Sequence, residues 1–410
     1  MIKCKIKDIV TLSLETLVPQ EGIAYHLYSL PSFDEGRQRE EVMGEDIGSN
    51  KFIVPDKCIL FNKLNVRFKR VWRIDNTDNN KLASTEFLPL IVDEEKVDFQ
   101  YCYYLLISDS ITKYLSGQTA NTSGSHKRIS PDDFLNIEVA LPEMTEQKRI
   151  GGFLSSIDRK IDVNQALNQD LENLTKQIYD YWFVQFDFPD ENGRPYKSSG
   201  GKMVWNETLK REIPEGWEVC NLYRIAKFTN GLACQKYRPK EGESSLPVIK
   251  IKEMHEGISP ETERVSSSIP ESVKIYDGDI LFSWSASLEV MLWAYGEGGL
   301  NQHIFKVTPK DGFPKSYVFF QLLHYIVVFR AMAEARKTTM GHITTDHIMQ
   351  SRICIPTESY LYENFENEME PFFEKFITNS KEIIQLQSLR SYLLPLLMTG
   401  QAKLKNKDDN

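Results

Sequence analysis

The sequence predicts an α+β protein in which two mixed α/β domains form a pseudo-two-fold repeat, separated by two long antiparallel α-helices that act as a coiled-coil spacer. Three observations support this fold class. Apolar residues from Ile150 to Ile161 step by four, three and four, the spacing of a helix that packs against a partner helix. A second stretch of this kind, 371–397, lies near the C-terminus. The segment before each stretch contains short β-like runs.

Length and composition are those of a globular protein with more than one domain. The chain has 410 residues, of which 41% are hydrophobic and 26% charged, enough to bury a real core. The start, MIKCKIKDIV, has no secretory h-region, and the longest apolar runs are too short to span a bilayer. We therefore expect a cytoplasmic protein. The six cysteines include no CxxC pair and are expected to be reduced thiols.

Self-similarity along the chain predicts a duplication. In the two helical stretches, a shift of 215 residues superimposes four pairs of positions: Asn164 on Asn379, Leu171 on Leu386, Leu174 on Leu389 and Ile178 on Leu393. Upstream, shifts of 214 to 221 residues superimpose four more pairs: Phe61 on Phe282, Trp72 on Trp293, His126 on His342 and Pro142 on Pro356. Because the matches keep one order, each half is expected to be one mixed domain followed by one long helix.

Each mixed domain is expected to combine short strands with a few helices. The first domain is placed at 1–144 and the second at 216–357. Their β-like runs, separated by Gly, Asn and Ser turns, are 57–61 and 70–74 in the first domain and 278–284, 291–295 and 303–307 in the second. Their clearest helical stretches are 97–115 and 316–335.

The rest of the chain divides into the long helices 145–188 and 358–402, the turn-rich connector 189–215 and the polar tail 403–410. Pro142 precedes the first long helix, Thr145 can cap it, and Glu146 suits its first turn. Pro356 and the acidic run ENFENEME are expected to play a similar role for the second long helix.

The seam between the two long helices is expected to contain these residues at helical spacing: Ile157, Ile161, Asn164, Leu171 and Ile178 on the first, and Asn379, Leu386 and Leu393 on the second. Asn164 and Asn379 occupy equivalent positions where apolar residues are expected. If the repeats are related by a pseudo-two-fold axis, the helices run antiparallel, and buried amides here fix their register at a cost in stability. The alternative is that both asparagines face solvent through local unwinding.

Motifs for catalysis are missing from the sequence. There is no GxxxxGK[ST] phosphate loop, no GxGxxG opening a βαβ unit, and no Asn/Asp-Pro-Pro of amino-methyltransferases. His342 and His347 are five residues apart, which is poor spacing for metal ligands, so no metal site is expected. Pro131-Asp132 followed by Glu146-Gln147-Lys148 imitates the carboxylate–lysine set of metal-dependent nucleases. Its second element falls at a helix start and not on a strand, so we expect no catalytic residues.

Positive charge collects in two segments, the basic islands, although the net charge of −9 argues at first against a nucleic-acid partner. The first basic island holds Lys63, Arg67, Lys69, Arg70 and Arg73, and the second holds Arg224, Lys227, Lys236, Arg238 and Lys240. Neither contains an acidic residue. Contact with DNA phosphates is the functional interpretation, and a solvated surface is the alternative.

Two polar loops carry side chains that can read base edges. The first contains Gln118, Asn121, Ser125, His126, Lys127 and Arg128, and the second Arg336, Lys337, Thr338, Thr339 and His342. Such side chains also populate ordinary turns. Trp284, in LFSWSAS, is expected to be a core residue more often than a wedge in a DNA groove.

The order of domain, helix, domain, helix resembles the specificity subunit of type I restriction–modification systems. The resemblance is carried by LPEMTEQKRIGGFLSSIDRKIDVNQALNQDLENLTKQIYDYWFVQFDFP, GRPYKSSGGKMVWNETLKREIPEGWEV, GGLNQHIFKV and LRSYLLPLLMTG, and with the repeat it covers almost the whole chain. The second long helix departs from the pattern, because it lacks the proline followed by Glu-Gln that precedes the first.

The resemblance implies that each mixed domain is a target-recognition domain for one half of a bipartite DNA site. The helices would set the spacing and dock two modification subunits. Those partners would carry S-adenosylmethionine and methylate adenine, and separate restriction–translocase subunits would use ATP and Mg²⁺. This chain would carry no cofactor. A helix of ~30 residues is about 45 Å long, which exceeds one DNA turn of roughly 34–36 Å.

Two rival functions stay open at this point. One is a non-catalytic helical scaffold that joins two protein-binding domains without reading DNA. The other is a metal-dependent nuclease that uses Asp132, Glu146 and Lys148. Selection from random-sequence DNA separates the first from a specificity subunit, because a scaffold enriches nothing. Glu146→Ala would abolish magnesium-dependent cleavage only in the second.

Overall fold

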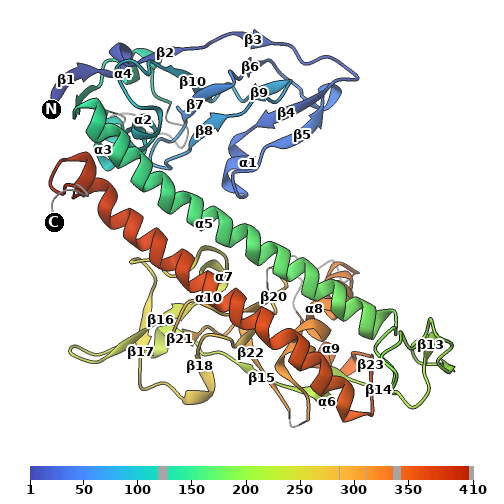
Figure 1. The fold of residues 1–410 in the computed structure, drawn as a ribbon. Helices are drawn as coiled ribbons and strands as arrows, with labels where there is room; N and C mark the ends of the chain where they lie inside the picture. Colours follow the sequence, from blue (N-terminus) through green and yellow to red (C-terminus); the bar gives the residue numbers. More distant parts are fainter. Residues whose placement is uncertain (119–127, 286, 311, 336–342, 406–410) are drawn as a thin grey trace. The chain divides into compact units, whose positions relative to one another are not determined.

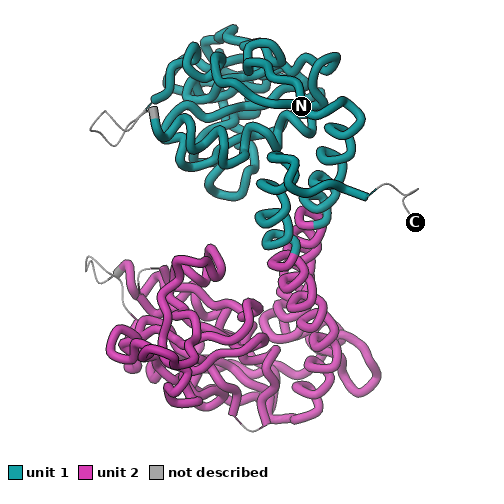
Figure 2. The backbone as a smooth tube through the Cα atoms, turned by 90° about the vertical axis from the view of Figure 1, so that its left-hand side faces the viewer, with its two compact units in different colours: residues 1–160, 386–410 teal, residues 161–385 magenta. Residues whose placement is uncertain are grey.

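The computed structural model describes residues 1–118, 128–285, 287–310, 312–335 and 343–405. The chain forms two compact units (Figure 2): unit 1 contains residues 1–160 and 386–410, and unit 2 contains residues 161–385. Each unit combines one mixed α/β lobe with part of each long helix. The boundaries between the units thus lie within the two long helices, whereas the sequence predicts domain boundaries where these helices begin.

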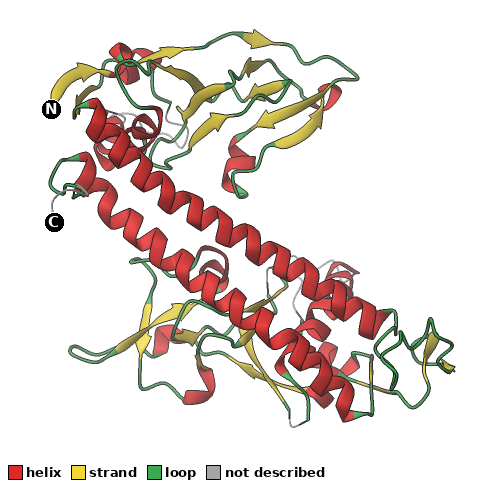
Figure 3. Cartoon of the chain, in the orientation of Figure 1, coloured by secondary structure: helices red, strands yellow, loops and turns green. Residues whose placement is uncertain are grey.

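The lobe of unit 1, the first lobe, is built from three sheets (Figure 3). A four-stranded antiparallel sheet has the order β2(Val10–Leu12)-β10(Phe87–Val92)-β7(Lys57–Asn62)-β8(Val71–Asp75). A five-stranded sheet has the order β3(Thr16–Leu17)-β6(Lys51–Ile53)-β9(Lys81–Ala83)-β4(Ala24–Tyr28)-β5(Glu40–Met43), with β4 and β9 parallel. Strands β1(Ile2–Lys5) and β11(Glu138–Leu141) pair as a small third sheet.

The lobe of unit 2, the second lobe, repeats this topology. Its sheet β15(Ala226–Asn230)-β22(Ile304–Pro309)-β19(Ile280–Ser283)-β20(Glu289–Leu292) corresponds to β2-β10-β7-β8. Its sheet β17(Arg264–Ser266)-β16(Ser245–Ile249)-β21(Gly298–Leu300)-β18(Lys274–Ile275), with β16 and β21 parallel, corresponds to β5-β4-β9-β6. The pair β14(Glu218–Cys220)-β23(Ile353–Ile355) corresponds to β1-β11. The duplication predicted from the sequence is therefore confirmed.

Strand β7 shows why the predicted apolar runs become central strands. Side chains of a strand alternate between the two faces of its sheet. Ile59 and Phe61 belong to the core formed with the helices of the lobe, while Cys58 and Leu60 belong to a second core containing Trp72. Because both faces are covered, the run is apolar at consecutive positions.

Helices cover the lobes. The first lobe has α1(Leu30–Asp34), α2(Phe99–Leu106), α3(Asp109–Gln118) and α4(Pro131–Leu135). The second has α6(Leu222–Ile225), α7(Ile251–Glu256), α8(Lys315–Ala335) and α9(Thr345–Gln350). Among the described residues, the segment Lys315–Glu334 is long and apolar enough to cross a membrane, and half of it is buried inside the protein. Its buried side chains, such as Tyr317 and Phe329, pack in the core of the second lobe.

The long helices are α5(Met144–Tyr179), continued by a π-helical turn at Asp180–Val184, and α10(Ser359–Met398). Helix α5 already begins at Met144, so Thr145 lies in its first turn and the predicted cap at Thr145 is wrong. Glu146 does lie in the first turn, as predicted. The first turn of α10 contains no acidic residue, because the run ENFENEME begins one turn later, so its predicted role at the helix start is also wrong.

Within each unit α5 and α10 lie side by side (Figure 1) and run antiparallel. In unit 1, Arg149 donates to the carbonyl oxygen of Leu404 at 2.6 Å, while Asp158, further along α5, accepts from Arg390, which precedes Leu404. In unit 2, Asn164 contacts Glu382, while Asn168, further along α5, contacts Ser380, which precedes Glu382 on α10. The antiparallel pairing that the repeat predicted is confirmed in both units.

The connector after α5 is partly ordered into a hairpin of β12(Met203–Asn206) and β13(Arg211–Pro214). Aromatic side chains hold the segment before the hairpin against the second lobe. Phe186 and Phe188 both contact the ring of Trp217, with centroids 5.3 Å apart in each pair. Arg211 places its guanidinium 4.5 Å from the ring centroid of Phe186.

Candidate nucleic-acid interface

The first basic island forms the loop between β7 and β8, residues 63–70, and the start of β8. Buried Asn62 shapes the loop, because its side-chain amide bonds both the N–H and the carbonyl of Leu64. Asn65 adopts a positive φ of 52°, which suits a tight turn. Phe68 is 48% exposed and lies between two guanidinium groups, those of Arg67 at 4.8 Å and Arg70 at 4.9 Å from its ring centroid. The loop thus presents an aromatic ring and cations together.

The β7–β8 loop lies beside the C-terminal end of the first polar loop. The N–H of Ile129 donates to the carbonyl of Lys63 at 3.0 Å, and Leu64 forms an antiparallel bridge with Arg128. The structure therefore brings together the first basic island and the base of the first polar loop, which are more than fifty residues apart in the sequence. This contact is the centre of the candidate interface of the first lobe.

Acidic residues from elsewhere in the first lobe offset much of its positive charge. Arg70 forms a two-pronged pair with Asp34 at 2.6 and 2.7 Å. Lys69 pairs with Asp109, and that hydrogen bond is the main reason why the pKa of Asp109 is lowered.

A third pair joins Arg128 to Glu86. All three ion pairs are partly solvent-exposed, so each contributes little to stability and a DNA phosphate can replace the carboxylate. Arg67 has no ion-pair partner among the residues that the structure describes.

Arg73 has contacts of a different kind. Its guanidinium donates to Gln100 and, at 3.1 Å, to Ser155 on α5, and it lies 5.0 Å from the ring centroid of Tyr103. The side chain is half-buried between the lobe and α5. Its contacts join the sheet to the helix, which is a structural role that the sequence did not predict.

The second lobe repeats the arrangement of the two loops. The N–H of Ile343, the first described residue after the second polar loop, donates to the carbonyl of Trp284 at 3.0 Å. Trp284 follows β19 as Lys63 follows β7, so the hydrogen bond from Ile343 is the counterpart of the one from Ile129. The duplication thus includes the loop contact as well as the sheets.

Around Trp284 the second lobe presents polar and aromatic groups in place of a basic island. The indole N–H of Trp284 donates to Asn230 at 3.2 Å, and its ring lies 5.6 Å from that of exposed His303. Gln302 contacts the imidazole at 3.3 Å. Trp284 is half-buried and also packs against the core of the second lobe, as the sequence predicted. The sequence prediction did not include its polar neighbours, although the motif GGLNQHIFKV carries Gln302 and His303.

The second basic island lies apart from this cluster. Arg224, on α6, is 3.8 Å from Glu218 and places its guanidinium 5.6 Å from the ring centroid of Phe313. Lys227 lies on β15 opposite Thr308. Lys236, Arg238 and Lys240 are exposed on the segment that leads to β16.

Most base-reading candidates lie outside the described residues: Asn121, Ser125, His126 and Lys127 in the first polar loop, and Arg336, Lys337, Thr338, Thr339 and His342 in the second. Gln118 ends α3. Their role in DNA contact stays a prediction.

The helix seam contains buried amides, as expected for a register-setting layer. Asn164 and Asn379 are 1% and 0% exposed. Asn379 donates to Asn168 at 3.0 Å, and Asn164 donates to Glu382 at 2.8 Å. The alternative in which the asparagines face solvent is therefore wrong.

The apolar seam residues are buried to different degrees. Ile157 and Ile161 are each 5% exposed. The remaining four are half-buried: Leu171, Ile178, Leu386 and Leu393. Ile178 packs on the core of the second lobe and Leu393 on that of the first.

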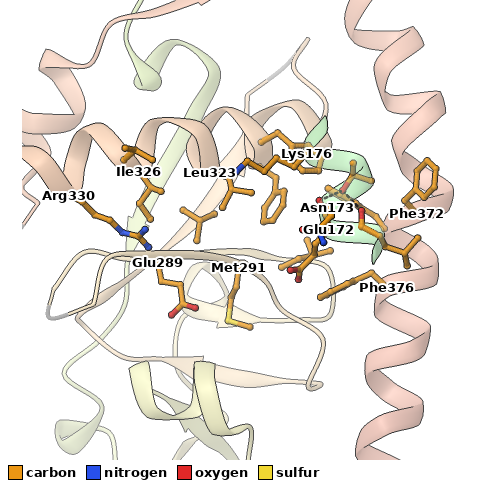
Figure 4. Close-up of a pocket in the computed structure, with 18 of the residues that line it drawn as sticks. Glu172, Asn173, Lys176, Glu289, Met291, Leu323, Ile326, Arg330, Phe372 and Phe376 are labelled. Atoms are coloured by element: carbon orange, nitrogen blue, oxygen red, sulfur yellow. Dashed lines mark hydrogen bonds between the residues drawn. The ribbon is translucent and has the colours of Figure 1, made fainter. Parts of the chain in front are cut away.

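A cavity of about 560 Å³ lies in unit 2 where α8 and β20 meet α5 and α10 (Figure 4). Its walls are mostly aromatic and aliphatic, with Phe372 and Phe376 from α10 and Leu323 and Ile326 from α8. Apolar walls of this kind do not suit a phosphodiester backbone, so the cavity is not part of the candidate interface.

The nuclease alternative finds no support in the geometry. Pro131 and Asp132 lie on α4, whereas Glu146 lies on α5 and accepts a hydrogen bond from Arg149 at 2.8 Å. That chemistry needs carboxylates on adjacent strands around one metal. Within the described ranges, no group of three or more His, Cys, Asp or Glu side chains could hold a metal ion.

Known proteins share both the sequence pattern and the fold. Residues 22–173 match the family described as type I restriction modification DNA specificity domain. The chain is 24% identical over 339 residues to the type I restriction enzyme MjaIX specificity subunit of Methanocaldococcus jannaschii, covering 80% of this chain and 74% of the relative. It is 22% identical over 407 residues to the HindI specificity subunit of Haemophilus influenzae, covering 86% and 88%.

A solved structure supports the fold independently of close sequence identity. The type I restriction–modification S subunit from M. genitalium superimposes with a TM-score of 0.58 at 15% identity, covering 97% of this chain and 95% of that one. These matches show that residues 22–173 are a type I restriction modification DNA specificity domain, and that the chain is similar over most of its length to specificity subunits of type I restriction enzymes.

Proposed function

We propose that the chain is the subunit that gives a type I restriction–modification complex its DNA sequence specificity, with each lobe reading one half of a bipartite target. The chain itself is not catalytic. The observation that carries the proposal is the repeated loop contact, Ile129 to Lys63 in one lobe and Ile343 to Trp284 in the other. Two similar reading surfaces on one chain favour two half-sites on one DNA molecule.

The two surfaces differ in chemistry, so the two half-sites are expected to differ in sequence. The first lobe presents Arg67, Phe68 and the ion-paired cations around them. The second lobe presents Trp284 and His303, groups that contact bases by stacking and hydrogen bonding. Such an asymmetric pair reads a target that is not palindromic.

The charge balance supports weak DNA binding by the chain alone. The chain has a net charge of −9, and three of the cations beside the first polar loop pair with carboxylates. Neutralisation of phosphates supplies most of the non-specific affinity for DNA. We therefore propose that tight binding needs positive surfaces of partner subunits, which would complete a clamp around the duplex.

The partners would be modification subunits, two per chain, and restriction–translocase subunits. Helix α5 offers an exposed apolar stripe to such a partner: Val163, Leu167 and Leu174 are 48%, 42% and 45% exposed. Positions separated by four and eleven residues lie on one face of a helix. S-adenosylmethionine, ATP and Mg²⁺ would belong to the partner subunits, and this chain would hold no cofactor.

The length of the helices suits a spacer. Helix α5 has 36 residues, which corresponds to about 54 Å at 1.5 Å per residue. This exceeds one DNA turn of roughly 34–36 Å. We propose that the two half-sites are separated by a gap of fixed length that the protein does not read.

The test is to assemble the chain with its modification subunits, methylate a random-sequence DNA library and sequence the modified sites. We expect two short specified sequences separated by a gap of constant length. A scaffold that does not read DNA would enrich no sequence. Gel shifts with the isolated chain at several salt concentrations complete the test, because tight, sequence-specific binding without partners would contradict the clamp.

A further inference from the structure

A buried polar cluster joins the first lobe to both long helices. Its centre is Asp158 on α5, which is 8% exposed. Tyr104 of α2, fully buried, donates to one carboxylate oxygen of Asp158 at 2.5 Å. Arg390 of α10 donates to the other oxygen at 2.6 Å. One carboxylate therefore connects three helices within unit 1.

The two donors of the cluster, Tyr104 and Arg390, keep their protons. Burial, together with the charge of Asp158, raises the pKa of the Tyr104 hydroxyl well above its usual value, so it stays a donor. Burial alone would lower the pKa of Arg390, but Asp158 more than offsets this and the pKa is raised. Tyr104 and Arg390 consequently both stay hydrogen-bond donors throughout the physiological pH range.

A second group of contacts supports the cluster from the sheet. Arg73 of β8 donates to Gln100 and to Ser155, and Ser155 in turn donates to Gln100 at 3.1 Å. Ser155 lies one turn before Asp158 on α5. The lobe is thus fixed to the helix at two neighbouring points by directional bonds.

The second lobe is joined to its helices without such a cluster. The repeat places Phe320 at the position of Tyr104, Phe373 at that of Asp158 and Thr175 at that of Arg390. The alignment is supported by Tyr101 and Tyr317, equivalent residues whose hydroxyls are both buried without a partner among the described residues.

Phe320 and Phe373 contact each other with ring centroids 5.8 Å apart, and together with Thr175 they line the cavity of about 560 Å³. The second lobe has its directional contacts with the helices at other positions: Tyr179 of α5 donates to Gln321 at 2.8 Å, and the N–H of Ser316 donates to Glu366 of α10 at 3.2 Å. The polar cluster is not a requirement of the fold.

Apolar contacts are non-directional, whereas charged hydrogen bonds demand a particular distance and angle. We propose that Asp158, Tyr104 and Arg390 are positioning residues that fix the angle of the first lobe on the helices, and so set how strictly the complex selects the gap between its half-sites. This inference rests on the proposed function. It assigns a positioning role to a polar cluster whose equivalent position in the second lobe holds packed phenylalanine rings.

Gap length is sensitive to such an angle. One extra base pair moves a half-site by about 3.4 Å along the duplex and also rotates it about the axis. A lobe held at one angle rejects the displaced half-site, while a loosened lobe turns to meet it. Base contacts within each half-site do not change in either case.

The experiment measures methylation rates of the assembled complex on DNA with the native gap and with gaps one base pair shorter and longer. For wild type we expect a preference for the native gap of about tenfold or more. Tyr104→Phe, Asp158→Asn and Arg390→Gln should reduce this ratio severalfold, with base preferences in both half-sites unchanged. Arg390→Lys, which keeps the charge, should retain part of the ratio.

Arg159→Gln is the matched control, because Arg159 is exposed beside Asp158 and its replacement should leave the ratio unchanged. If the Tyr104 and Arg390 variants lower all rates equally and keep the wild-type ratio, the cluster is merely structural and the inference is overturned. Tyr104→Phe removes a single oxygen, so it keeps the test open if the charge variants fold poorly. A wild-type complex that methylates without sequence preference would instead contradict the proposed function.

Discussion

Replacement of Asn168 by leucine tests whether buried amides set the register of the long helices. Asn379 donates to Asn168 at 3.0 Å, and Asn168 donates to the hydroxyl of Ser380 at 3.0 Å. The side-chain oxygen of Asn379 has no partner among the described residues, so the bond to Asn168 is what satisfies this amide. Asn168→Leu would leave the whole buried amide of Asn379 unpaired.

The size of the effect follows from this arrangement. A buried polar group left without a partner costs about 1–3 kcal/mol, so we expect Asn168→Leu to destabilise the helix pair by about 2 kcal/mol. Asn379→Leu should cost less, about 1 kcal/mol, because Asn168 keeps its bond to Ser380. Replacing both amides removes both unpaired groups. The double variant should therefore lie close to wild type, with a coupling energy of about 1–3 kcal/mol.

Hydrogen exchange of the full chain, followed by mass spectrometry on peptides from 161–172 and 376–385, measures the local opening of the pair. A cost of about 2 kcal/mol corresponds to roughly 30-fold faster exchange in the single variant. Gln165→Leu is the control, since Gln165 is exposed on the same helix. Additive costs in the double variant, or single effects below about 0.5 kcal/mol, would refute the amide pairing as a specificity device.

Three further predictions concern the candidate interface. Glu86→Gln releases Arg128, and Asp109→Asn releases Lys69. Each variant should strengthen DNA binding of the assembled complex at low salt and steepen the salt dependence by about one phosphate contact, as measured by fluorescence anisotropy. Arg67→Ala should weaken binding to all sequences alike and reduce the slope by about one. Trp284→Ala or His303→Ala should alter base preference in one half-site and leave the other intact, as read from sequenced methylation sites.

The outcomes that would contradict these predictions are distinct. Unchanged salt slopes in the Glu86 and Asp109 variants would mean that the released cations do not meet phosphate. A sequence-dependent loss in Arg67→Ala would make Arg67 a base reader. A change in both half-sites on replacement of Trp284 would show that the second lobe does not read DNA independently of the first.

Local patterns were enough to predict the framework of the protein. The long helices follow from apolar residues at helical spacing, and strands such as β7 from consecutive apolar residues between turn formers. The duplication followed from matches such as Trp72 with Trp293, both of which are buried. These features depend on the order of residues within short windows, which the sequence displays directly.

The composition of the interface could be predicted only in part. The first basic island and the base of the first polar loop do lie together. However, Arg70 pairs with Asp34, 36 residues away, and Lys69 with Asp109, 40 residues away. Arg73 serves the joint with α5 and not the loop surface. A list of basic residues therefore overstates the charge that DNA would meet.

The sequence by itself determined the repeat, the antiparallel helices and the absence of recognisable catalytic motifs. Only the tertiary structure decided which basic side chains form ion pairs and which amide accepts the hydrogen bond from Asn379. It also decided that Asp158 joins the first lobe to the long helices, whereas the equivalent position in the second half is a phenylalanine. The physical reason is that periodicity is a property of neighbours along the chain. Ion pairs and hydrogen bonds depend on groups that only the folded chain brings within 3 Å.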